Sequence, residues 1–256
     1  MSRRLVWFSC GAASAVLAKL AVEEYGDECE VIYCDTMATE HMDNARFFVD
    51  VEKWIGRSIT RIKSDKFATV DDVFERTRYM AGIAGARCTT EMKKIPREAF
   101  QRPGDVHLFG YTSDEEKRGD DFEERNPTLR VEWLLIERGI SKAGCLRILA
   151  DARIALPAMY ALGFDHNNCL GCVKATSPGY WNRIRRVAPE VFERRAHQSR
   201  IIGARLVRIR GVRKFLDEMP TDADAPDDDI DCGPACQMPL DFDTIATARA
   251  AGGKGT

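Results

Sequence analysis

The stretch WFSCGAASAVLAKLA, residues 7–21, passes from an apolar strand pattern to a helical repeat across a turn of small residues. From Ala13 onward the apolar residues recur at helical spacing. The turn between them, residues 9–14, leaves backbone N–H groups free at the positive end of the helix. Small side chains let a phosphate approach those groups closely. We therefore predict an anion site here, against the alternative of an ordinary strand-to-helix turn.

The composition is that of a folded domain. The chain has 256 residues, 45% of them hydrophobic and 30% charged, with a formal net charge of -2. This length suits one large domain, or one domain with an appendage. No apolar run approaches the roughly 18 residues of a membrane span. The first apolar run reads as a strand rather than a signal peptide. We expect a cytoplasmic protein, in which nine cysteines favour metal or redox chemistry over disulfides.

Strand-like and helical segments alternate along the first part of the chain. The strands are expected at 5–9, 30–34, 59–62, 106–110 and 131–136, and the helices at 13–25, 41–55, 70–80, 114–125 and 142–152. This order predicts a Rossmann-like α/β fold: a mostly parallel sheet with helices on both faces and ligands at the carboxyl ends of the strands.

The remainder of the chain has a different pattern. A Gly/Asn/Cys-rich segment at 163–180 reads as an ordered loop, and 189–203 reads as a helix. We predict a nucleotide-binding domain at 1–155, a mainly helical region with the Cys loop and basic residues at 156–220, and an acidic linker with a Cys-containing tail at 221–256.

The second expected strand ends in YCDTMATEH, residues 33–41. An acidic residue at this position of such a sheet commonly faces the nucleoside of a bound nucleotide. Asp35 and Thr36 can bond to a ribose or a base. The alternative is that Asp35 or Thr39 caps the following helix, since Asp and Thr both favour that position.

These two motifs together resemble those of the phosphoadenosine phosphosulfate (PAPS) reductase family, within the PP-loop superfamily of adenine nucleotide α-hydrolase-like enzymes. Family members carry SGGxDS at the loop and a DTG-type motif with a following glutamate. The positions that match are Ser9, Gly11, Ser14, Asp35, Thr36 and Glu40. Cys10 replaces a glycine, and Ala13 replaces the aspartate of members that cleave ATP. The second replacement argues against magnesium-assisted ATP cleavage but not against backbone binding of a phosphate or sulfate.

Two further segments extend the resemblance. RCTTEMKKIP, residues 87–96, is similar to the family's CC-x-x-x-K-V-x-P, with Cys88 and Lys93 in place and Thr89 in place of the second cysteine. GYTSDEEKR, residues 110–118, is similar to the region that contacts the nucleotide's anionic end. From the resemblance we assign Lys93 a catalytic role, and the nucleotide contacts to Ser9, Gly11, Ala12, Ser14, Asp35, Thr36, Gly110 and Arg118. The alternatives are a structural thiol at Cys88 and a solvated helix start at Arg118.

The most chemically specific motif is Cys169-Leu-Gly-Cys172. Two thiolates at this spacing can bind one metal centre, although redox dithiols share the pattern. In family members that have one, the double cysteine and a downstream CxxC hold a [4Fe–4S] cluster. The resemblance therefore implies that Cys88, Cys169 and Cys172 are cluster ligands, with zinc as the alternative metal.

The tail contains Asp-Cys232-Gly-Pro-Ala-Cys236. Asp-Cys-Gly is similar to the family's C-terminal Glu-Cys-Gly-x-His, whose cysteine attacks the sulfonate sulfur, but the histidine is missing here. Cys232 is therefore either a nucleophile or, like Cys236, a metal ligand. We assign Cys232 as the catalytic thiol and Cys236 as the fourth ligand, and two inert tail cysteines are the remaining alternative.

Residues 183–214 concentrate positive charge. They contain eleven Arg or Lys against two Glu, a local net charge of +9 in a chain of net charge -2. Such a patch suits nucleic acid or the anionic part of a nucleotide. The alternative is an exposed helix whose charges pair with the Asp-rich 221–231 segment.

The leading functional hypothesis is the reaction of the family: thiol-dependent reduction of an adenylyl sulfate ester to sulfite, with a thioredoxin-like reductant. The nucleotide is PAPS, adenosine phosphosulfate (APS) or ATP. A second hypothesis is an iron–sulfur sulfurtransferase that thiolates a nucleic acid. A third is a non-catalytic nucleotide-binding module.

Overall fold

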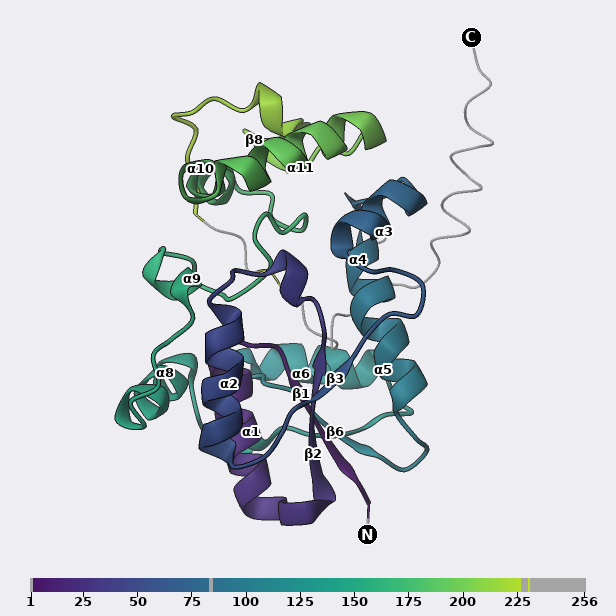
Figure 1. Ribbon diagram of the computed structural model, residues 1–256, viewed down its shortest axis with the longest axis vertical. Helices are drawn as coiled ribbons and strands as arrows, with labels where there is room; N and C mark the ends of the chain where they lie inside the picture. The colour runs from purple at the N-terminus through teal and green to yellow at the C-terminus, as the bar shows by residue number, and fades with distance from the viewer. Residues whose placement is uncertain (1, 83–84, 227–229, 231–256) are drawn as a thin grey trace.

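The computed structural model describes residues 2–82, 85–226 and 230, and within them a five-stranded sheet forms the centre of the molecule (Figure 1). All neighbouring strands of this sheet are parallel. Their order is β3 (Thr60–Ile62), β2 (Cys29–Cys34), β1 (Arg4–Phe8), β6 (Val106–Leu108) and β7 (Arg130–Glu132).

Strand β1 occupies the middle of the sheet. Val6 pairs with Val31 of β2 on one side and with Leu108 of β6 on the other. The chain moves outward from β1 to β3 in one direction and then restarts at β6 in the other. The carboxyl ends of β1 and β6 therefore flank a topological switch point, where sheets of this kind bind their ligands.

Helices cover both faces of the sheet, as the sequence predicts. One face packs against α1 (Ala12–Tyr25), α2 (Asn44–Ile55), α7 (Leu134–Glu137) and α8 (Lys142–Asp151). The other packs against α5 (Ile95–Phe100) and α6 (Glu116–Arg125), with Trp7 and Phe109 between them. The two faces have separate apolar cores, because successive residues of each strand point to opposite sides.

A second group of elements lies beyond the carboxyl ends of the strands, at the top of Figure 1. It contains α3 (Val70–Thr77), α10 (Pro178–Val187), α11 (Pro189–Ile202) and the hairpin of β8 (Val207–Ile209) and β9 (Val212–Lys214). One apolar cluster joins residues 70–92 to residues 159–230. The predicted division of the chain at residue 155 remains a prediction, and this cluster contains residues from both sides of it.

Shorter elements connect these units. They are β4 (Ala81–Gly82), β5 (Gly85–Ala86), α4 (Arg87–Thr89), a π-helical turn at Thr90–Lys94, α9 (Ala158–Ala161) and 3₁₀ turns at Gly26–Glu28, Met37–Thr39, Ser113–Glu115 and Leu216–Glu218.

Some predicted boundaries are wrong. The strand expected at 131–136 ends at Glu132. Leu134 and Leu135 instead belong to α7 and are buried in the apolar core between the sheet and α1. The loop expected at 163–180 ends earlier, where Ser177 caps α10. No helix in the described ranges is both long and apolar enough to cross a membrane.

Candidate active site

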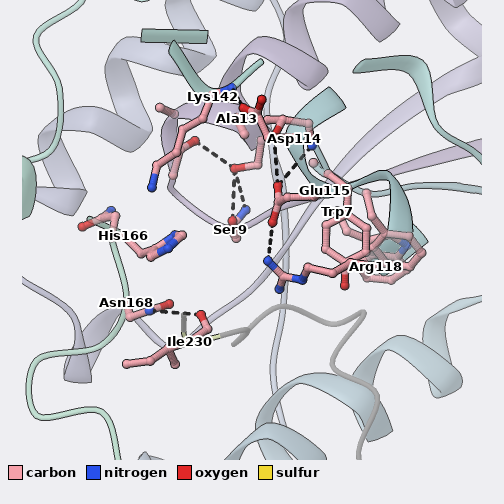
Figure 2. Close-up of a pocket in the computed structure, with 18 of the residues that line it drawn as sticks. Trp7, Ser9, Ala13, Asp114, Glu115, Arg118, Lys142, His166, Asn168 and Ile230 are labelled. Carbon is pink, nitrogen blue, oxygen red and sulfur yellow. Dashed lines mark hydrogen bonds and ion pairs between the residues drawn. The ribbon is translucent and has the colours of Figure 1, made fainter. Parts of the chain in front are cut away.

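A cavity of about 380 Å³ opens at the switch point between β1 and β6 (Figure 2). Its walls come from the turn after β1, the segment after β6, the start of α6, and the loop that leads to Cys169. Of the predicted site residues, those that line it are Ser9, Gly11, Ala12, Ser14, Lys93, Gly110, Arg118 and Cys169. The structure thus brings most of the predicted nucleotide contacts together.

The turn after β1 is held by its own hydroxyl groups. The Ser9 backbone N–H donates to Ser14 Oγ over 3.1 Å, and the two serine Oγ atoms lie 3.2 Å apart. Ser14 Oγ also donates to the Gly11 carbonyl over 3.0 Å. A Cβ built on Gly11 would lie 3.7 Å from Ser9 Oγ. The glycine therefore leaves an unfilled space beside the hydroxyls.

Cys10 adopts a backbone conformation that side-chain-bearing residues rarely take, with φ of +60°. Glycine adopts this conformation without strain, whereas Cys10 does not. The thiol is buried, and burial raises its pKa far above the ordinary value. Asn167 Nδ2 donates to the Cys10 carbonyl over 2.7 Å and so fixes the strained residue. The Cys10 thiol is a packing group.

Gly110 lies directly against the start of α1. A Cβ at this position would lie 3.0 Å from the Ser14 backbone nitrogen and 3.1 Å from Ser14 Cα. Both are backbone atoms, so they cannot rotate away. The predicted nucleotide contact Gly110 therefore also has a packing role: it lets the segment after β6 approach the turn after β1.

Charged groups of both signs line the cavity. The cations are Lys93, Arg118 and Lys142, and the carboxylates are Glu40, Asp114 and Glu115. Figure 2 shows the ion pair of Arg118 with Glu115. Glu115 also accepts from the Thr112 backbone N–H over 3.1 Å, which anchors this pair to the chain after β6. Arg118 is thus held at the wall of the cavity.

Two predicted nucleotide contacts lie elsewhere. Asp35 and Thr36 line a separate cavity of about 440 Å³ at the ends of β2 and β3. There the Asp35 carboxylate lies 3.5 Å from Lys63 Nζ. Thr36 Oγ1 donates to Glu40 Oε1 over 2.6 Å, and Glu40 itself lines the first cavity. The motif after β2 thus reaches the first cavity through its glutamate.

A chain of amides continues from Glu40. Asn44 Nδ2 donates to Glu40 Oε2 over 2.7 Å, and Asn167 Nδ2 donates to Asn44 Oδ1 over 2.9 Å. Asn167 lies two residues before Cys169, the first cysteine of the CxxC motif. This network therefore ties the motif after β2, the turn after β1 and the Cys loop into one unit.

The predicted metal ligands have distinct surroundings. Cys169 lines the cavity, and Thr39 Oγ1 donates to its Sγ over 3.5 Å. Cys172 is buried in the apolar cluster that joins residues 70–92 to residues 159–230, and Cys88 packs against the same cluster. Among the described residues no group of three or more His, Cys, Asp or Glu has the spacing of a metal site. The calls at Cys232 and Cys236 lie outside the described residues.

The CxxC loop is seated tightly on α11. Gly171 has φ of +66°, and a Cβ there would lie 2.8 Å from Val191 Cγ1. Arg195 Nε donates to the Gly171 carbonyl over 3.2 Å. The glycine is thus needed both for the turn and for the close contact between loop and helix.

The basic segment 183–214 is partly an internal structure. Arg195 is only 1% exposed and pairs with Asp71, and Arg200 pairs with Asp217 at 2.8 Å. Both of these acidic partners lie outside the Asp-rich segment 221–231, which is the alternative partner expected for the basic residues. The exposed basic residues of this region include Arg186, Arg205, Arg208 and Arg210.

Sequence reasoning missed several residues that line the cavity: Lys142, Tyr160, His166, Asn168 and Ile230. His166 and Asn168 lie next to the CxxC motif, and the other three belong to no motif, so their position in three dimensions identifies them. Asn168 Nδ2 donates to the Ile230 carbonyl over 3.4 Å, which brings the chain back to the cavity two residues before Cys232 (Figure 2). No protein-family model and no curated protein matches the chain.

Proposed function

We propose that the chain binds an adenylyl sulfate ester in the cavity between β1 and β6 and reduces it to sulfite. The observation that carries this proposal is the joint lining of one cavity by the turn after β1, Lys93 and Arg118. The turn offers amides and hydroxyls to a phosphate, and the two cations offset the charge of a phosphosulfate. Ala13 leaves the turn without the carboxylate that ATP-cleaving relatives of the resembled family use.

The chemistry runs in two displacements. The Cys232 thiolate attacks the sulfonate sulfur, the bond from that sulfur to the phosphate oxygen breaks, and the nucleotide leaves with the electron pair. A thiolate of a dithiol carrier then attacks the Cys232 sulfur and releases sulfite. The second thiol of the carrier resolves the mixed disulfide, so the carrier is oxidised and Cys232 returns as a thiolate. Lys93 and Arg118 stabilise the charge on the leaving phosphate.

The predicted ligands suit a [4Fe–4S] cluster in their chemical type, because cysteine thiolates are the usual ligands of such clusters. Cys88 and Cys172 share one apolar cluster and Cys169 lies at the cavity edge, so the proposed cluster would lie beside the nucleotide, with Cys236 as its fourth ligand. When bound, the cluster would supply thiolate-ligated iron near the cavity. It takes no part in either displacement. Zinc is the alternative occupant.

One observation favours a second candidate, the sulfurtransferase that thiolates a nucleic acid. Arg208 and Arg210 project from the β8–β9 hairpin and are exposed, as is Arg186 on α10. Exposed arginines on one region suit a phosphate backbone. This candidate requires nucleic-acid binding that weakens steeply with salt.

The test uses the full chain purified without air. We expect sulfite release from PAPS or APS in the presence of a dithiol, and only weak, non-productive binding of ATP. Absence of sulfite from both esters, together with salt-sensitive binding of RNA or DNA that is lost in Arg208→Glu, would replace the reductase by the sulfurtransferase.

A further inference from the structure

Tyr160 places a hydroxyl group on the anion-binding turn from a distant part of the chain. The Ala12 backbone N–H lies in the first turn of α1, where amides have no acceptor within the helix, and it donates to the Tyr160 hydroxyl oxygen over 3.3 Å. The Tyr160 ring packs against the apolar core between the sheet and α1, and the residue lines the cavity. Tyr160 thus lies where the helix end would meet an anion.

The short helix that carries Tyr160 is held by α2. A helix of four residues such as α9 has little stability of its own. The Asp43 carboxylate accepts from the Ala158 backbone N–H over 2.9 Å. Arg46 pairs with Asp43 at 2.7 Å and donates to the Leu156 carbonyl over 3.0 Å. These contacts fix the Tyr160 hydroxyl relative to the turn.

The hydroxyl group retains a hydrogen to donate. The Ala12 amide uses one lone pair of the Tyr160 oxygen, and in the described part of the chain no acceptor takes the O–H. Burial raises the pKa of Tyr160, so the phenol stays neutral at physiological pH. The position of a Cβ on Gly11 lies 3.9 Å from this hydroxyl and 3.7 Å from Ser9 Oγ. The missing side chain of Gly11 therefore leaves a gap between two hydroxyls.

We infer that the Tyr160 hydroxyl donates a hydrogen bond to the anionic 5′ group of the bound nucleotide, in the gap above Gly11. Tyr160 then makes the site prefer a phosphorylated nucleoside over the free nucleoside. This inference rests on the proposed nucleotide site and adds a specificity-determining residue from outside the predicted motifs.

The test compares the affinity for AMP with that for adenosine, measured by calorimetry on the full chain and on Tyr160→Phe. The loss of one hydrogen bond to a charged group predicts AMP binding weakened by about tenfold, with adenosine binding changed by less than about twofold. The matched control is Tyr25→Phe, which removes a hydroxyl from a tyrosine that does not line the cavity. It should change neither affinity.

A second variant guards against misfolding at Tyr160. In Gly11→Ala the new Cβ makes only ordinary contacts and φ of -98° is open to alanine, so the fold should persist while the gap is filled. AMP should again weaken more than adenosine. An unchanged or increased AMP affinity in Tyr160→Phe would overturn the inference, and so would equal weakening of both ligands, which indicates a merely structural role. If the wild-type chain binds neither ligand, the proposed nucleotide site fails and the inference fails with it.

Discussion

Gly179, in the first turn of α10, should be intolerant of even one added methyl group. A Cβ there would lie 2.2 Å from the Ala225 carbonyl oxygen and 2.6 Å from Asp224 Oδ1. The main-chain oxygen cannot rotate away, so the segment that contains Ala225 must retreat by about 1 Å to reach even the closest contacts that are normally tolerated. We therefore expect Gly179→Ala to detach this segment from α10.

The cost follows from the hydrogen bonds that hold the segment. Ser177 Oγ donates to the Ala225 carbonyl over 2.9 Å. Asn182 Nδ2 donates to the carbonyls of Ala223, over 2.6 Å, and Pro220, over 3.2 Å. At about 1 kcal/mol each, their loss costs about 3 kcal/mol. Better helix propensity of alanine returns up to about 1 kcal/mol, so the free energy of unfolding should fall by about 2 kcal/mol.

Urea unfolding and sulfite release together measure this effect. Because the segment leads to Ile230 at the cavity and then to Cys232, turnover should fall while AMP affinity stays unchanged. Gly144→Ala is the matched control, since a Cβ there meets only side-chain atoms at 3.4 Å and beyond. It should leave stability equal or slightly higher. If Gly179→Ala keeps both the wild-type unfolding free energy and the wild-type turnover, the expectation that the packing of residues 220–225 against α10 supports stability and turnover is refuted.

Three further variants probe other parts of the account. Gly110→Ala should lower the free energy of unfolding by about 1–3 kcal/mol and weaken AMP binding, because its Cβ meets the Ser14 backbone at 3.0 Å; unchanged values in both assays would contradict this. Arg195→Met should destabilise the fold by about 3 kcal/mol in urea. Burial tends to raise the pKa of Asp71, but Arg195 outweighs it and holds that pKa below its ordinary value. The wild type should therefore lose stability as pH falls below about 4, where Asp71 gains a proton on unfolding, and Arg195→Met should lose less. Cys169→Ala should abolish the brown colour of anaerobically purified protein, whereas colourless wild type with bound zinc would exclude the cluster.

The sequence was sufficient for the parts of the structure that depend on local pattern. The α/β architecture and the turn at residues 9–14 follow from hydrophobic periodicity and small residues, and the structure has both. The helix expected at 13–25 ends at Tyr25, and Gly26 follows it with φ of +53° and its N–H bonded to the Val22 carbonyl. Each of these features is decided by residues close together in the chain.

Features that depend on distant contacts could not be predicted. Tyr160 reaches the turn only because Asp43 and Arg46 hold α9 from more than 100 residues away. Arg195 counts as surface charge in the sequence, yet it is buried because Asp71, 124 positions earlier, supplies its partner. Asp35 carries the right motif but faces a second cavity, since the direction of its side chain depends on how β2 and β3 end together.

The central claim is that a cysteine thiolate attacks the sulfonate of a nucleotide held between β1 and β6. The most direct measurement is mass spectrometry of the full chain after mixing with APS or PAPS in the absence of a reductant, followed by peptide mapping. We expect one sulfonate adduct per chain, located on Cys232, released as sulfite on addition of a dithiol, and absent from Cys232→Ser although that variant still binds AMP. Catalytic sulfite formation without any protein-bound sulfonate, or an adduct that persists in Cys232→Ser, would contradict the account.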